Sequence, residues 1–307
     1  MLRRNDPRWA YILVNLATLL WASNIVLGRF LRHEIGPITL SAARFSVAGL
    51  IFIVLLRNSQ KNQARPGQSL NPNPPQPVRM DWLLYLGMGL VGVFGFTTLL
   101  YFALRYTTAS HAALINAATP LVTAGLAAAF LKERFTKRLL AGTILSLAGV
   151  GLVIGVGSTN MADSPQALFG DLLCLFAAVL WGIYSILGRL ATKTKPSMQV
   201  TAFSIWFALP LLYLAAGVEW QTAPPSLTPP VLLAAVYIGI FPSVIAFSAW
   251  NEGVRMAGPN QAMAFYNMLP VYGTLLGVAL LGESLSWSTL FGGVLVIAGG
   301  MMIARLR

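Results

Sequence analysis

Apolar residues are concentrated in ten stretches of the chain, and the polar residues lie mostly between them. A helix needs about 20 largely apolar residues to cross the hydrocarbon core of a bilayer. The pattern therefore predicts an all-α polytopic membrane protein with ten transmembrane helices. The expected helices cover approximately residues 9–30, 38–56, 82–104, 109–131, 139–156, 168–189, 197–217, 230–251, 260–281 and 286–304.

The second half of the sequence repeats the first. Leu20-Trp21 and the following Gly28-Arg29 recur 160 positions later. Each copy contains five expected helices, and because five is odd the copies have opposite orientations in the membrane. We expect a first repeat over residues 1–156 and a second, inverted repeat over residues 157–307, an arrangement typical of secondary transporters. Further matched positions, 150 residues apart, are Pro120, Leu131, Glu133, Gly142 and Gly149 with Pro270, Leu281, Glu283, Gly292 and Gly299.

Composition and charge favour membrane insertion and predict its direction. Apolar residues make up 56% of the chain and charged residues 10%, whereas soluble proteins contain about 25% charged residues. With a cytoplasmic N-terminus, 17 Lys and Arg residues lie inside and three outside. Because basic loops remain in the cytoplasm, we expect both termini and the proline-rich segment 57–81 there. The net charge of +12 then reflects topology and contact with the lipid bilayer, not nucleic-acid binding.

The chain offers little material for catalysis. It has two histidines, one cysteine and nine acidic residues. Seven acids fall in predicted loops or tails, and the other two, Asp171 and Glu252, fall at span ends, so no carboxylate pair is expected inside the membrane. No lysine follows a glycine, which excludes a nucleotide-binding P-loop. We expect no enzyme activity, no catalytic residue, no metal site and no cofactor.

Polar and aromatic residues within the spans predict a central cavity. Arg44 lies six residues into the second span, where it could anchor helices through their carbonyl groups or attract a substrate carboxylate. Trp21 and Trp181 fall near mid-span, which an interfacial aromatic belt does not explain. Each polar residue could instead join two helices. The candidate cavity residues are Trp21, Asn24, Arg44, Tyr101, His111, Asn116, Trp181, Tyr184, Ser243, Tyr266 and Asn267.

Prolines and acidic residues at matched positions predict hinges and turns. Pro120 and Pro270 lie near the middle of the fourth and ninth spans, where each frees a backbone carbonyl; they are candidate gating hinges or static kinks. Glu133 and Glu283 precede the next span, and we expect them to help cap it. His111 could relay a proton or hold helices together, and we expect transport that needs no imposed proton gradient.

Several of these features together resemble a known family. They are the five-plus-five arrangement, Leu-Trp in the first and sixth spans, Arg44-Phe45 in the second, and Pro120 and Pro270 followed by Leu-Lys-Glu and Leu-Gly-Glu. From about residue 9 to residue 304 the chain resembles the EamA-type exporters of the drug/metabolite transporter superfamily. Within them it is most similar to the YddG-type exporters of aromatic and other amino acids.

The resemblance implies a multi-pass protein of the bacterial inner membrane that exports small metabolites, amino acids among them, by alternating access. The expected state is a monomer or weak homodimer. The chain lacks the first-span glutamate of the small multidrug relatives and has no lysine within a span, which argues against proton-coupled cation export and phosphorylated sugars. The alternatives are a broad-specificity drug or metabolite exporter and, in a different class, a membrane receptor or scaffold that transports nothing.

Overall fold

The structure is a computed structural model that describes residues 7–63, 79–116, 119, 123, 125–126, 136–155, 165–266, 268–283 and 285–304. Secondary structure in these residues is helical, without a strand, which confirms the all-α prediction for this part of the chain. Within it, six helical segments are long and apolar enough to cross a membrane: Arg8–Phe30, Pro37–Asn58, Asp81–Ala103, Pro165–Ala191, Ser197–Thr222 and Pro229–Ala257. Shorter apolar helices accompany them.

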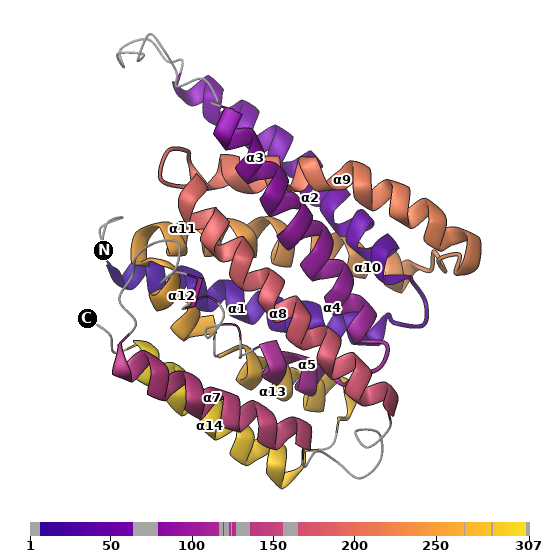
Figure 1. Ribbon diagram of the computed structural model, residues 1–307. Helices are drawn as coiled ribbons and strands as arrows, with labels where there is room; N and C mark the ends of the chain where they lie inside the picture. The colour runs from indigo at the N-terminus through magenta and orange to yellow at the C-terminus, as the bar shows by residue number, and fades with distance from the viewer. Residues whose placement is uncertain are drawn as a thin grey trace.

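Most described helices coincide with predicted spans (Figure 1), but the fourth predicted span is described only over its first part and the ninth comprises two helices. The first half contains α1 (Pro7–Phe30), α2 (Pro37–Gln63), α3 (Arg79–Met88), η1 (Gly89–Phe96), α4 (Thr97–Ala103), α5 (Ala109–Asn116) and α7 (Lys137–Gly155). The second half contains α8 (Pro165–Ala191), α9 (Ser197–Thr222), α10 (Pro229–Ile238), η2 (Gly239–Ile245), α11 (Ala246–Ala257), α12 (Pro259–Tyr266), α13 (Leu269–Leu281) and α14 (Trp287–Ala304). Both α2 and α9 run several residues past the predicted ends at 56 and 217.

A π-helical segment interrupts the third helix of each half. The two segments, η1 and η2, begin at Gly89 and Gly239, which are 150 residues apart. In η2, Pro242 has no N–H to donate, and Ser243 Oγ donates instead to the Ile238 carbonyl at 2.8 Å. Because π segments distort a helix locally and are frequent at functional sites, both mark the middle of these helices as special.

The two halves interlock at these π segments. A Cβ on Gly89 would lie 2.6 Å from the Ser204 carbonyl oxygen of α9, and a Cβ on Gly239 would lie 3.0 Å from the Arg44 carbonyl oxygen of α2. The third helix of each half therefore packs against the second helix of the other half, at a distance that only glycine permits. The two halves therefore contact each other closely at the middle of their third helices.

Helices α7 and α14 form a separate pair beside this interlocked bundle (Figure 1). A Cβ on Gly149 would lie 2.5 Å from the Gly292 carbonyl oxygen, and a Cβ on Gly299 would lie 2.8 Å from the Ser146 amide nitrogen. Glycines that the sequence places at matched positions of the fifth and tenth expected spans therefore lie at the contact between these two helices.

Two carboxylates cap helices of the first half from the second half. Glu219, predicted in a loop, lies in α9 and accepts from the amides of Ile38 and Thr39 at the start of α2, at 3.2 and 2.8 Å. Glu283 accepts from the amides of Ala109 and Ser110 at the start of α5, at 2.9 and 3.1 Å. The prediction that Glu283 caps the helix after it is therefore wrong, because its carboxylate satisfies the free N–H groups of α5.

Candidate functional site

An aromatic cluster fills the centre of the bundle and draws on both halves. The Trp21 ring of α1 lies 4.8 Å from Trp181 of α8 and 5.3 Å from Trp250 of α11, measured between ring centroids. Tyr266, the last residue of α12, lies 5.5 Å from Trp250. Trp21 and Trp181 occupy matching positions in the two repeats, so equivalent tryptophans of the two halves contact each other.

Arg44 lies against this cluster with its side chain buried, at 2% exposure. Its Nε donates to Ser243 Oγ at 2.9 Å, and its Nη1 donates to Tyr101 Oη at 2.7 Å and Asn24 Oδ1 at 3.2 Å. The guanidinium carbon also lies 4.5 Å above the centre of the Phe45 ring. The anchoring predicted through helix carbonyls is therefore wrong in detail, since side chains from α1, α4 and η2 hold the guanidinium.

The Nη2 group of the Arg44 guanidinium is left for a ligand. No hydrogen bond to Nη2 of Arg44, and no carboxylate in salt-bridge range, occurs among the residues that the structure describes. Because the Nε hydrogen and both Nη1 hydrogens are already donated, Nη2 is the group that remains for a carboxylate, which a buried guanidinium without an anionic partner attracts strongly.

A second polar cluster repeats this arrangement with two residue types exchanged. Tyr101 donates to Asn24 Oδ1 in the first half. In the second half Asn251 Nδ2 donates to Tyr184 Oη at 3.1 Å and to Thr201 Oγ1 at 2.6 Å. Tyr184 is 160 positions after Asn24, and Asn251 is 150 positions after Tyr101. Sequence reasoning missed Asn251 and Thr201, although the two repeat offsets, applied to Tyr101, point to Asn251.

The repeated Gly-Arg motif explains how these polar pairs are placed. A Cβ on Gly28 would lie 2.7 Å from the Tyr101 ring, and one on Gly188 would lie 3.3 Å from Asn251 Oδ1. The glycine thus leaves room for the polar residue of the third helix. The arginine after it fastens the end of the same helix: Arg29 Nη1 donates to the Leu104 carbonyl at 2.8 Å, and Arg189 Nη1 donates to the Val254 carbonyl at 3.3 Å.

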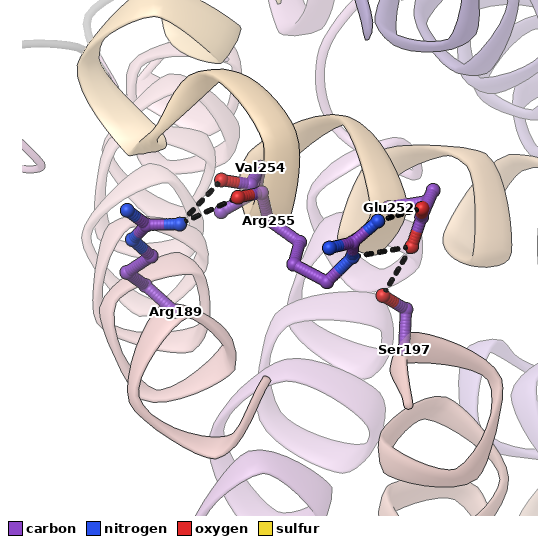
Figure 2. Close-up of polar contacts among 5 residues, drawn as sticks. All are labelled: Arg189, Ser197, Glu252, Val254 and Arg255. Carbon is purple, nitrogen blue, oxygen red and sulfur yellow. Dashed lines mark hydrogen bonds and ion pairs between the residues drawn. The ribbon is translucent and has the colours of Figure 1, made fainter. Parts of the chain in front are cut away.

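Charged and polar side chains join α8, α9 and α11 near the ends of these helices (Figure 2). Arg189 also donates to the Arg255 carbonyl at 2.7 Å. Glu252 accepts from Ser197 Oγ at 2.8 Å at the start of α9, and it pairs with the Arg255 guanidinium. Glu252 therefore ties helices together, which agrees with its predicted place at a span end.

The cavity enclosed by the aromatic cluster is small. It measures about 20 Å³, which is room for about one water molecule. No amino acid fits a space of this size while the lining side chains stand as described. Its lining consists of Trp21, Asn24, Ile25, Arg44, Phe96, Leu100, Trp181, Phe247, Tyr266 and Leu269.

Five of the predicted cavity residues line this space, and five described ones do not. The lining members are Trp21, Asn24, Arg44, Trp181 and Tyr266. Tyr101 and Ser243 are bonded to Arg44, and Tyr184 stacks on Trp181 with ring centroids 4.8 Å apart. Asn116 donates to the Ala112 carbonyl of its own helix at 2.7 Å, while Asn267 and Pro120 lie outside the described residues. Pro270 lies in the first turn of α13, directly after the interruption that separates it from α12.

His111 belongs to a different buried cluster. Its Nδ1 lies 3.3 Å from Asp171 Oδ2 of α8, and the two side chains are 5% and 4% exposed. Thr107 Oγ1 donates to the other oxygen of Asp171 at 2.5 Å. Sequence reasoning missed this pairing because Asp171, six residues into α8, looks like a solvated acid near a helix end.

We expect His111→Gln to retain at least part of its transport, because a glutamine amide can still donate to Asp171. Uptake into proteoliposomes without an imposed proton gradient measures this, with His33→Gln as the matched histidine control. Complete loss of transport in a stably folded His111→Gln protein, with strict dependence of the parent on a proton gradient, would show that facilitated transport is the wrong mechanism.

Comparison with known proteins gives a consistent result. The sequence profile described as the EamA-like transporter family matches residues 8–155 and again residues 168–305. An aromatic amino acid exporter, YddG, from Ancylobacter novellus is 26% identical over 292 residues, covering 94% of this chain and 94% of that protein. A probable amino-acid metabolite efflux pump from Salmonella typhimurium is 25% identical, covering 92% and 91%.

A further relative and a solved structure match almost the whole chain. The uncharacterized transporter YyaM from Bacillus subtilis is 26% identical over 293 residues, covering 94% of this chain and 91% of that protein. One solved structure, described only as the crystal structure of a protein, aligns with a TM-score of 0.69 at 24% identity, covering 97% of this chain and 96% of that chain. At that identity the structural likeness concerns the fold alone.

Proposed function

The chain belongs to the EamA-like transporter family, and from this premise we propose that it exports small metabolites, aromatic amino acids among them, by alternating access through the central cavity. It is a multi-pass membrane transporter and not an enzyme. We also propose that it lies in the bacterial inner membrane, that it has ten spans in two inverted repeats over residues 1–156 and 157–307, and that both termini are cytoplasmic.

The observation that carries the proposal is the buried Arg44 at the edge of an aromatic-lined cavity. A carboxylate attached to a flat apolar body matches a guanidinium next to indole and phenyl rings. Two relatives with amino-acid export in their names support this substrate class. A broad drug exporter would have little use for a fixed buried cation, because neutral drugs give it no partner.

Alternating access is supported by the paired design of the two halves. Each half contributes a tryptophan, an Asn–Tyr pair and a π-helical segment to the centre. An exchange of conformation between equivalent halves opens one side while closing the other. The small closed cavity is the arrangement expected between the two open states.

Counterflow in proteoliposomes tests the function directly. Vesicles are preloaded with unlabelled L-phenylalanine, and the entry of labelled L-phenylalanine is followed, with L-alanine, L-lysine and a neutral aromatic drug as competitors. Exchange inhibited by phenylalanine and not by the drug supports the proposal. Inhibition by the drug favours the broad exporter, and absence of exchange with labelled phenylalanine and, in a second run, with labelled drug favours a receptor or scaffold.

Within this assay, Trp21→Ala, Tyr101→Ala and Trp181→Ala are expected to reduce counterflow more than Trp9→Ala. The first three residues surround or hold the cavity, whereas Trp9 is 39% exposed near the start of α1. Rates are compared at equal membrane abundance, and size-exclusion chromatography identifies variants that do not fold. Equal rates in all four variants would assign the central aromatic residues to packing only.

The topology is expected to be visible with reporter fusions. A reporter after Arg307 should be cytoplasmic, and one inserted between Gly157 and Gln166 should be external, because residues 157–166 contain no Lys or Arg. A third reporter in the 57–81 segment serves as the cytoplasmic control. Cytoplasmic labelling between Gly157 and Gln166 would contradict the inverted arrangement of the repeats.

A further inference from the structure

The polar groups that face the cavity can donate hydrogen bonds, and few of them can accept one. Asn24 Oδ1 already accepts from both Arg44 and Tyr101, and since arginine only donates, this fixes the oxygen of the amide toward Arg44. Trp21 Nε1 donates to the Pro242 carbonyl at 3.0 Å. Among the lining side chains, only the Tyr266 hydroxyl has acceptor capacity with no described partner.

One donor at the cavity is without an acceptor. Trp181 is 1% exposed and lines the cavity, yet its Nε1 has no hydrogen-bond partner in the described structure. Trp250 Nε1, in the ring packed against Trp21, is buried in the same condition. A buried N–H without an acceptor is unfavourable and rare. The Trp181 indole and the Nη2 group of Arg44 therefore both favour a ligand that brings acceptor oxygens.

The acidic residues that could receive an ammonium group are engaged elsewhere. Asp171 is bonded to His111, Glu219 caps α2, Glu252 pairs with Arg255, and Glu283 caps α5. The two remaining described acids behave alike: Asp81 lies 3.4 Å from Lys195 Nζ, and Glu34 accepts from Thr228. None of these six lines the cavity.

An α-ammonium group would therefore enter a site whose described lining contains a cation and no carboxylate. The Arg44 charge repels it, and burial removes its water in exchange for one neutral acceptor among the described lining side chains, the Tyr266 hydroxyl. The Trp21 and Trp181 rings that line the cavity can attract a cation, but the lining also contains the fixed positive charge of Arg44, which opposes that attraction.

We infer that the site recognises the carboxylate and the apolar body of its substrate and not the α-ammonium group. The substrate class is then apolar carboxylates, such as aryl-substituted acids and N-acylated amino acids, with free aromatic amino acids as its less favoured members. This inference rests on the proposed export through the same cavity. Among ligands with the same aromatic ring and a carboxylate, those without an ammonium group should therefore bind with the highest affinity.

A binding series on one ring tests the inference. Purified protein in detergent is titrated with 3-phenylpropionate, N-acetyl-L-phenylalanine, L-phenylalanine and 2-phenylethylamine, and quenching of the cavity tryptophans gives each Kd. We expect the two acids without an ammonium group to bind about three- to tenfold more tightly than L-phenylalanine. The amine without a carboxylate should show no saturable binding.

Two variants connect the order of affinities to named groups. Arg44→Gln should weaken both acids by at least about tenfold, whereas Trp181→Phe, which keeps a ring and removes the N–H, should weaken them by about threefold. Tighter binding of L-phenylalanine than of 3-phenylpropionate overturns the inference, and so does saturable binding of 2-phenylethylamine. In either case counterflow of L-phenylalanine leaves the proposed function standing. Absence of both counterflow and binding removes the proposed function itself.

Discussion

Replacing Arg44 with glutamine is expected to reduce counterflow by at least about tenfold at equal membrane abundance. The guanidinium holds Ser243, Tyr101 and Asn24 together, and Arg44 is one of the residues that line the cavity. A hydrogen bond to a charged group contributes about 1.5–3 kcal/mol, which corresponds to a factor of about 10 to 100. Glutamine can restore part of the bonding to neighbouring side chains, but it cannot attract a carboxylate.

Arg44→Lys separates charge from geometry in the same experiment. Lysine keeps the positive charge and loses the fork that bonds three neighbours at once, so we expect intermediate rates. Arg57→Gln, at an exposed position further along α2, is the matched control and should leave transport unchanged. Counterflow above half of the parent rate in a folded Arg44→Gln protein would show that the substrate does not bind at this guanidinium.

Gly299→Ala is expected to destabilise the protein by about 1–3 kcal/mol, the range typical of an added group in a closely packed contact. The new methyl would lie 2.8 Å from the Ser146 amide nitrogen of α7, and backbone cannot turn aside as a side chain can. The measurement is the temperature at which half of the purified protein loses its monodisperse elution. The pairing of α7 with α14 predicts a clear decrease for this variant.

Gly217→Ala is the control for that measurement. Gly217 also lies in a helix, but a Cβ there would meet nothing within 4 Å, so its loss should be neutral or slightly stabilising. An unchanged transition in Gly299→Ala would mean that α7 and α14 can separate without loss of stability.

The internal repeat made the central cluster predictable. Trp21 and Trp181 are 160 residues apart in the sequence, and each lies where an interfacial role fails to explain it. Because equivalent helices of interlocked repeats meet at the centre, equal positions in the two copies come together, and the structure places these two rings 4.8 Å apart. Hydropathy likewise located the long helices, since burial in lipid requires continuous apolar runs.

Partners across the bundle were beyond the reach of sequence patterns. His111 and Asp171 are 60 residues apart and belong to no repeated pair, so nothing in the spacing connects them. Glu283 looked like a cap for the helix that follows it, yet it caps α5, because helix ends that lie close in space compete for the same carboxylate. Such choices depend on the packing of whole helices, which the hydrophobic period of one helix does not encode.

The contacts of Arg44, which occur in the first half, bear on the free energies of the transport cycle that we propose. If the two halves were identical, the conformations open to either side would be related by a two-fold rotation and would have equal free energy, so an empty carrier would populate them equally. At the position 160 residues after Arg44 the second half has the neutral side chain of Ser204, which donates to the Thr201 carbonyl of its own helix at 2.8 Å. The hydrogen bonds of a buried guanidinium therefore occur in the first half without a counterpart at the matching position of the second half. In the alternating-access cycle that we propose, this difference would give the empty carrier a preferred orientation, which a bound carboxylate could shift by competing for the same arginine.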